Sequence, residues 1–185
     1  FDTVVSNDHA ASMTAVQTLI AAGHTKIAHL TYKTDLLGPT LRLRGYLDAM
    51  REAGLPVDDR SVIEASDFTA PASREAAIDS LRDASDRPTA IFCVSDQLAM
   101  GLYQAAARLG LSIPTELSVM GFGGGRLIAD ELDPPLTTMA VPYFELGEWA
   151  VRRLVDARTA PRSPVVHEIA ASLRARGSVG PPSRQ

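Results

Sequence analysis

Short apolar runs alternate with longer segments of helical periodicity along most of the chain. The apolar runs fall at 26–30, 62–63, 90–94, 117–122 and 165–169, with an extended passage at 136–139. In the segments between them, apolar residues recur at the spacing of one helix face. Strands that alternate with helices are typical of a parallel sheet covered on both faces, so the sequence predicts a doubly wound α/β fold.

Turn-forming residues indicate where the predicted helices begin and end. Asn7 or Asp8 can cap the first helix, and Gly23 can supply its left-handed stop. A loop through Gly38-Pro39 leads to the second helix, which is predicted at about 40–53. The later helices are predicted at about 71–81, 96–109 and 142–157. The tail 177–185 is rich in glycine, proline and serine, so we predict that it frays.

The composition is that of a globular protein without a surplus of positive charge. Hydrophobic residues make up 45% and charged residues 22%, and 18 basic against 22 acidic residues give a net charge of -4. This segment alone therefore cannot neutralise a phosphate backbone, which disfavours nucleic-acid binding by it. The single cysteine, Cys93, excludes an internal disulfide and suits a buried thiol in a reducing compartment, so we expect a cytoplasmic protein.

The apolar runs and the first residue of the chain bear on membrane insertion and on processing. No run approaches the ~20 apolar residues that a membrane helix requires, so we expect no membrane partner. The chain opens with Phe1 rather than an initiator methionine, and we expect a fragment or a processed product.

The sequence offers no constellation for catalysis or for metal binding. The four histidines lack metal-ligand spacing, and there is no zinc-protease motif, nucleophile elbow or phosphate-binding loop. The run Gly121 to Gly125 begins like a dinucleotide-binding motif, but Ile128 stands where the third glycine belongs. We therefore expect no enzyme, no metal site and no cofactor.

Several short motifs occur in one order, and together they resemble one protein family. The motifs are Gly23-His24, Arg42-Leu43-Arg44-Gly45-Tyr46, Asp67-Phe68, Ser95-Asp96-Gln97-Leu98-Ala99-Met100-Gly101, Val119-Met120-Gly121-Phe122 and Pro134-Pro135-Leu136-Thr137-Thr138. Each is weak alone. Their joint order and spacing, from about Asp2 to Arg176, resemble the effector-binding domain of the lactose/galactose repressor (LacI/GalR) family of transcription regulators.

The resemblance implies a periplasmic-binding-protein-like fold of type I, with a small effector such as a sugar held between two lobes and a homodimer as the working unit. The second lobe would comprise 7–137 plus 161–176 and be complete, whereas 1–6 plus 138–160 would be the remnant of a truncated first lobe. The helix-turn-helix domain that reads operator DNA in the family would precede this chain. This fragment is therefore expected not to bind DNA by itself.

Two side chains match ligand-contacting positions of that family. Arg42, in the pattern Arg-x-x-Gly-aromatic, would reach ligand oxygens, because a guanidinium offers five donors in a rigid fork. The alternative is a solvated arginine near a helix start, where positive charge is unfavourable. Phe68 would stack on a sugar or base ring, although phenylalanine is more commonly a core residue.

The remaining candidates follow two later strands. Ser95 stands where the family usually has asparagine; it is either a ligand contact or a helix cap, and Asp96 is expected to be mainly structural. Gly123 replaces the family aspartate that accepts bonds from ligand hydroxyls, which puts a conventional monosaccharide in doubt. The glycines could let the backbone approach a ligand, could cradle an anion through their amides, or could form a flexible loop without a ligand. Arg126 could then favour an acidic or phosphorylated effector.

These observations favour a regulator whose effector shifts the population that is competent to bind operator DNA. One rival is a secreted or periplasmic sugar-binding protein of the same architecture, which an upstream signal peptide would reveal. A second rival is a Rossmann-like nucleotide enzyme, but no nucleophile, base and orienting group converge in the sequence.

Overall fold

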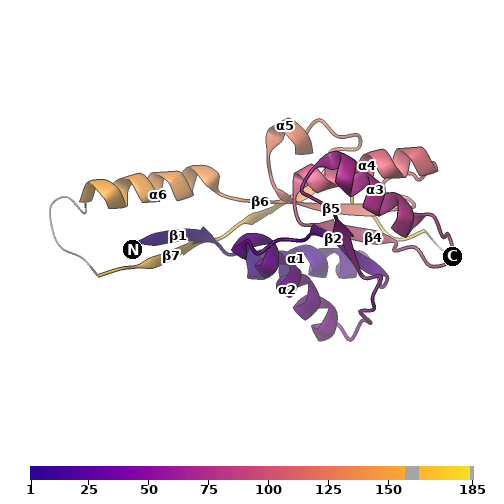
Figure 1. Cartoon of the computed structure of the whole chain (residues 1–185), viewed down its shortest axis with the longest axis horizontal. Helices are drawn as coiled ribbons and strands as arrows, with labels where there is room; N and C mark the ends of the chain where they lie inside the picture. The colour runs from indigo at the N-terminus through magenta and orange to yellow at the C-terminus, as the bar shows by residue number, and fades with distance from the viewer. Residues whose placement is uncertain (157–162, 184–185) are drawn as a thin grey trace.

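The computed structural model describes residues 1–156 and 163–183, which form a large α/β body with a narrow extension (Figure 1). The sequence prediction of a doubly wound α/β fold is confirmed. The elements in chain order are β1 (Thr3–Ser6), α1 (Asp8–Ala21), β2 (Ile27–Tyr32), α2 (Leu37–Glu52), β3 (Val62–Ala65), α3 (Ala70–Leu81), β4 (Ala90–Cys93), α4 (Asp96–Leu109), β5 (Ser118–Gly123), α5 (Arg126–Ala129), β6 (Thr137–Ala140), α6 (Tyr143–Asp156), β7 (Val166–Ile169) and β8 (Ser172–Arg174).

A six-stranded sheet in the order β3-β2-β4-β5-β6-β8 forms the centre of the body. Its first five strands are parallel, and β8 pairs antiparallel with β6. Because parallel strands all run in one direction, their carboxyl ends meet along one edge of the sheet. Open sheets of this kind bind ligands at that edge, which we call the carboxyl edge.

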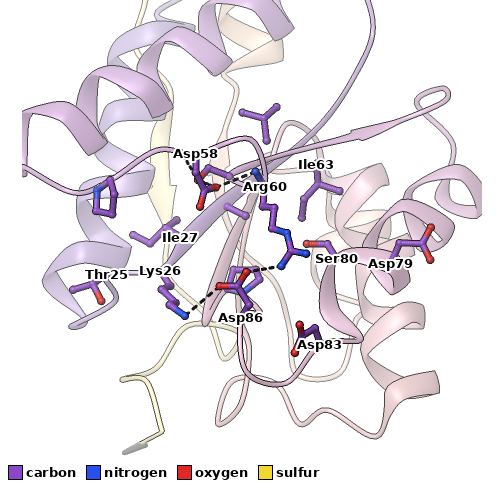
Figure 2. A pocket seen from close by; sticks show the side chains of 15 residues that line it. Thr25, Lys26, Ile27, Asp58, Arg60, Ile63, Asp79, Ser80, Asp83 and Asp86 are labelled. Carbon is purple, nitrogen blue, oxygen red and sulfur yellow. Dashed lines mark hydrogen bonds and ion pairs between the residues drawn. The ribbon is translucent and has the colours of Figure 1, made fainter.

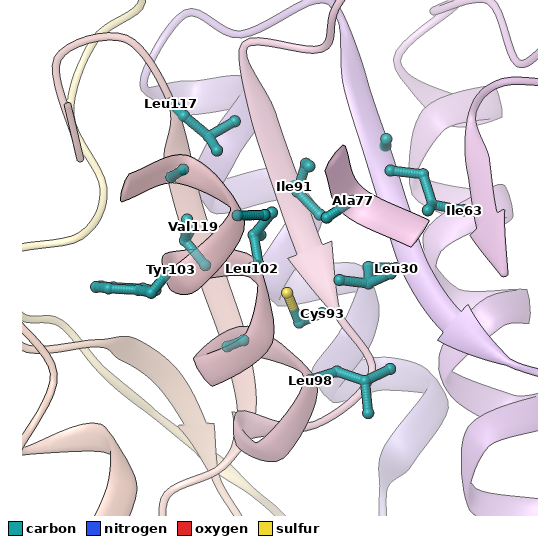
Figure 3. Close-up of a cluster of buried hydrophobic side chains, with 14 of the residues drawn as sticks. Leu30, Ile63, Ala77, Ile91, Cys93, Leu98, Leu102, Tyr103, Leu117 and Val119 are labelled. Carbon is teal, nitrogen blue, oxygen red and sulfur yellow. The ribbon is translucent and has the colours of Figure 1, made fainter. Parts of the chain in front are cut away.

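Helices cover both faces of this sheet, as the continuous apolar strands predict. One core lies under α3 and α4 and includes Leu30, Ile91 and Val119 from the sheet and Leu98 and Leu102 from α4 (Figure 3). Each of these side chains is fully buried and contributes about 1.5–3 kcal/mol to folding. The thiol of Cys93 is buried in the same core, as predicted from its apolar run.

The second core lies under α1 and α2, and two glycines bring the helices of each layer close together. A Cβ atom at Gly45 would lie 2.4 Å from the carbonyl oxygen of His9, on α1. A Cβ atom at Gly101 would lie 2.2 Å from the carbonyl oxygen of Ala70, on α3. Both positions therefore require glycine for the contact between neighbouring helices.

The narrow extension consists of β1, β7 and α6, which we call the small unit (Figure 1). The sequence assigns 161–176 as a whole to the larger body, but β7 pairs with β1, from Thr3↔Val166 to Ser6↔Ile169. Of the described part of this segment, 163–176, only β8 joins the large sheet. Strand β6 continues that sheet to Ala140, beyond the expected boundary at 137. The predicted helix end at 157 lies outside the described residues.

The segment 177–183 differs from the frayed tail predicted for 177–185, of which 184–185 lie outside the described residues. Ser178 is buried; its hydroxyl accepts from the amide of Thr137 (2.8 Å) and donates to the carbonyl of Val119 (2.6 Å). The carbonyl of Gly180 accepts from His24 Nε2 at 2.9 Å. Glycine and proline in this segment thus serve a close fit against the body rather than disorder.

Two expected helix starts also differ. The second helix begins at Leu37, because Pro39 falls in the first turn, where the amide that proline lacks has no helical acceptor. Neither Asn7 nor Asp8 makes a side-chain cap on α1. No helix in the described part of the chain is long and apolar enough to span a bilayer.

Candidate functional site

Arg42 lies at the carboxyl edge of the large sheet, as its assignment to a ligand-contacting position requires. Its Nη1 donates to the carbonyl oxygen of Val94, immediately after β4, at 2.9 Å. Its Nη2 lies 3.2 Å from Asp8 Oδ2, and its Cζ lies 3.9 Å from the ring centroid of Phe122. With 17% of its side chain exposed, Arg42 is a fixed, half-buried cation rather than a solvated one.

The local sequence around Arg42 explains this placement. Gly45, three residues later, lets α2 approach α1, so that Arg42 reaches the start of that helix. The hydroxyl of Tyr46 donates to the carbonyl oxygens of Ile27 (2.9 Å) and Ser61 (3.2 Å), which anchors α2 on the sheet. Burial raises the pKa of Tyr46 to about 12, so this hydroxyl remains a donor. Arg42, Gly45 and Tyr46 of the motif Arg-x-x-Gly-Tyr therefore each have a packing or hydrogen-bonding role.

Asp8 is a site residue that the sequence analysis did not identify. It is the first residue of α1, where an anion is favourable to the helix dipole, and only 8% of its side chain is exposed. Besides Arg42, it accepts from the hydroxyl of Ser6, the last residue of β1. Asp8 thereby connects Arg42 to the point where the chain enters the large body from the small unit.

Three aromatic rings form a row beneath Arg42. His29, Phe92 and Phe122 come from the adjacent strands β2, β4 and β5, with centroids 4.9 Å and 6.4 Å apart. His29 also stacks on Tyr46 at 5.3 Å, and its Nδ1 donates to the carbonyl oxygen of Phe92 at 3.0 Å. Burial, together with the nearby charge of Arg42, lowers the pKa of His29 to about 3. His29 is therefore a neutral part of the support for Arg42.

Asp96 organises the glycine loop that follows β5. Its Oδ2 accepts from the amides of Gly124 (2.7 Å) and Gly125 (3.2 Å), and its Oδ1 accepts from the hydroxyl of Thr138 (2.6 Å). Burial raises the pKa of this carboxyl, while the hydrogen bonds of Thr138 and the two amides oppose the shift. This agrees with the structural role expected of Asp96.

The anion-cradle and flexible-loop hypotheses for the glycines both need correction. The amides of Gly124 and Gly125 point at Asp96, so the anion that they hold is a side chain of the protein itself. The loop is also not free, because a Cβ atom at Gly124 would lie 2.6 Å from the Cα of Ala140. The loop is thus fixed between Asp96 and the strand that leads out to the small unit.

The other candidates occupy the same edge in different surroundings. Ser95 caps α4, with its Oγ accepting from the amide of Leu98 at 3.2 Å, and its hydroxyl hydrogen remains available. Phe68 follows β3 and is 61% exposed, with its ring 6.1 Å from that of Tyr32. Arg126 is exposed at the start of α5, directly after the loop. Arg42, Ser95 and Gly123 are therefore close neighbours, and their contact with a ligand stays a prediction.

Two cavities lie away from the carboxyl edge. One, of about 360 Å³, opens at the amino ends of β2 and β3. Figure 2 shows Lys26 and Arg60 both turned toward Asp86 there, so these charges already have partners. The other, of about 470 Å³, lies in the small unit between β1 and α6. Among the described residues, no group of histidine, cysteine and carboxylate side chains could hold a metal ion.

Comparison with known proteins identifies relatives of this chain. A model described as a periplasmic binding protein-like domain matches residues 16–179. The ribose operon repressor of Haemophilus influenzae is 39% identical over 156 residues, which are 84% of this chain and 46% of that protein. The HTH-type transcriptional repressor CytR of Escherichia coli K12 is 38% identical over 154 residues, 83% of this chain and 44% of that protein.

The solved structures agree with the sequence relatives. A LacI family transcriptional regulator from Enterococcus faecium with bound ribose has a TM-score of 0.89 at 25% identity, over 97% of this chain and 66% of that chain. The present chain spans about half the length of the curated relatives that it matches. The chain belongs to the lactose/galactose repressor (LacI) family of transcription regulators and has the periplasmic-binding-protein-like fold of its effector-binding domain.

Proposed function

We propose that this chain is the effector-sensing and dimerising part of a transcription regulator that holds a small sugar-like metabolite at the carboxyl edge. The observation that carries the proposal is the state of Arg42. It is locked in place by Val94, Asp8 and Phe122, yet these partners occupy only two of its five N–H donors. A fixed cation with unused donors at the ligand-binding edge of an open sheet is suited to grip ligand oxygens.

The contacts of Asp8 support coupling between the effector and the rest of the protein. Arg42 and Ser6 share the carboxylate of Asp8, so a ligand that draws Arg42 toward itself changes a contact of the strand entering from the small unit. Asn7 reinforces this crossing, because its Oδ1 accepts from the amide of Ala171 at 2.8 Å. An effector that prefers one arrangement of the crossing strands shifts the population of that arrangement by its differential affinity.

The proposal places operator binding in a domain outside this chain. The net charge of -4 gives the chain no surplus of cations for DNA, whereas the relatives are repressors. We propose that the intact regulator is a cytoplasmic homodimer, because a two-fold protein matches a two-fold operator. No metal, cofactor or catalytic step is part of this function.

The test uses the full-length protein and a DNA fragment from upstream of its own gene. Fluorescence anisotropy measures the operator Kd with and without D-ribose, D-ribose 5-phosphate or D-ribonate. We expect at least one of them to change the Kd by about 5- to 150-fold, the usual range of allosteric coupling.

Two substitutions on α2 make this test specific to the carboxyl edge. Arg42→Lys keeps the charge beside Asp8 but removes the planar fork, so it should abolish the change in operator affinity. Arg44→Lys alters an exposed arginine of the same helix and should leave the change intact. Full coupling in the Arg42→Lys protein would refute the proposed role of this edge.

A further inference from the structure

We propose, on the basis of the function proposed above, that the effector is an anion rich in acceptor oxygens, a phosphorylated or carboxylated sugar-like molecule, and not a neutral sugar. The inference comes from a comparison of the hydrogen-bond donors and acceptors that the carboxyl edge leaves unused. A ligand has to complement what remains, because a buried polar group without a partner is costly.

The two buried carboxylates of the edge are already occupied by donors from the protein. Asp96 accepts from two amides and one hydroxyl, at 2.7, 3.2 and 2.6 Å. Asp8 accepts from Arg42 and Ser6. A third carboxylate, Asp67, is exposed beside Phe68 and accepts from the amide of Thr69 at 2.7 Å. The hydroxyls of a neutral sugar need acceptors, and the two buried carboxylates already direct their oxygens at donors of the protein. Of these three carboxylates, only the exposed Asp67 is left to accept from a ligand.

The donors at the edge remain available. Arg42 has used one hydrogen of each Nη, which leaves the second hydrogen on both nitrogens. Ser95 Oγ accepts in the cap of α4, and its hydroxyl hydrogen has no acceptor among the residues that the structure describes. Within the described part of the chain, the guanidinium of Arg126 has no hydrogen-bond or ion-pair partner, and it is exposed next to the glycine loop. Unused donors of positive charge favour an anionic ligand.

The backbone prevents an easy return of the missing acceptor. Gly123 has a φ of 139°, which side-chain-bearing residues rarely adopt. A Cβ atom there would lie 3.2 Å from Asp96 Oδ2, so an aspartate would place a second negative charge against the first. The loop geometry therefore disfavours a carboxylate at 123, so this position offers a neutral sugar no side-chain acceptor.

The experiment is a calorimetric titration of the full-length protein with three matched ligands. D-ribose is neutral, D-ribose 5-phosphate carries a phosphate and D-ribonate a carboxylate, so the two anionic arms distinguish the source of the charge. We expect at least one anion to bind about tenfold more tightly than D-ribose. Raising the salt concentration should weaken the anion and leave ribose unchanged.

Charge reversal provides the matched variants. Arg126→Glu should lower the affinity for the anion about tenfold without changing the affinity for ribose. Arg108→Glu reverses an exposed charge at the end of α4 that lies away from Ser95, and it should change neither affinity. Equal losses in the two variants would overturn the contribution of Arg126.

The outcomes separate this inference from the proposed function. If D-ribose binds as tightly as both anions or more tightly, the selectivity for anions is wrong while the sensor function stands. If none of the three ligands binds, the proposed sugar-sensing function fails together with the inference.

Discussion

The buried imidazole of His29 makes the stability of the protein depend on pH in a defined window. Its pKa is about 3 in the folded chain, against an ordinary value of 6.5. The folded state therefore holds His29 neutral, while the unfolded chain takes up a proton below pH 6.5. The stabilisation is fully present above pH 6.5 and is lost as the pH falls toward 3.

The magnitude follows from this difference. At pH 5, which is 1.5 pH units below the unfolded pKa, protonation stabilises the unfolded chain and lowers the free energy of unfolding by about 2 kcal/mol, since each pH unit is worth about 1.4 kcal/mol. The lowered pKa of His24 acts in the same direction. The raised pKa of Asp96 acts in the opposite direction, because acidification neutralises a buried charge. These contributions persist when His29 alone is replaced.

Urea unfolding at pH 7.5 and pH 5.0 measures the effect. In the His29→Phe variant, which keeps a ring between Tyr46 and Phe92, the loss on acidification should be about 2 kcal/mol smaller than in the wild type. Met50→Leu alters a fully buried side chain that does not titrate, in the core that also contains Tyr46 and Phe92, and serves as the control with an unchanged loss. An identical pH response in wild type and His29→Phe would refute the reasoning.

Four further substitutions, one of them a control, test the glycine loop and the docked tail. Asp96→Asn should lower the free energy of unfolding in urea by about 2–3 kcal/mol, because both oxygens of Asp96 accept hydrogen bonds and asparagine keeps only one oxygen. Retention of full stability would contradict this role. Gly124→Ala should lower the free energy of unfolding by about 2 kcal/mol, since φ at Gly124 is 75° and a Cβ atom would meet Ala140. Gly125→Ala, with open space around it, is the control and should change the melting temperature little. Equal effects of the two substitutions would count against a fixed loop. Ser178→Ala should cost about 1–2 kcal/mol by leaving two backbone groups without their partner, and no loss would indicate a weakly docked tail.

The layered body could be predicted from the sequence because its signals are local. The helix predicted at 96–109 coincides with α4, and Gly110 ends it at a φ of 70°. The apolar runs at 26–30, 90–94 and 117–122 appear as β2, β4 and β5. Periodicity and stop residues act within one element, so no knowledge of distant contacts is needed.

The features that escaped prediction depend on partners far apart in the sequence. Strand β7 pairs with β1 across the whole length of the chain, and 177–183 is ordered by contacts with Val119 and Thr137. No local pattern distinguishes these segments from a strand of the larger body or from a loose end. Their structure is decided by burial and hydrogen bonding in the folded molecule.

The candidate site shows the same division. Arg42 could be identified from its motif, but its partner Asp8 lies 34 positions away and looked like a helix cap. The glycine loop looked flexible or ready to bind an external anion, because the sequence does not reveal that Asp96 reaches its amides. The sequence did contain a signal for this role of Asp96. Ser95 and Asp96 can both cap the same helix, and because one residue suffices as the cap, the other is free to bind elsewhere.

The most direct measurement is a crystal structure of the full-length regulator with the ligand that binds most tightly among D-ribose, D-ribose 5-phosphate and D-ribonate. The account predicts ligand oxygens within hydrogen-bonding distance, about 3 Å, of the Nη atoms of Arg42, next to Ser95 and Phe68. Ligand density in the cavity at the amino ends of β2 and β3, with Arg42 still bonded only to Val94 and Asp8, would contradict it.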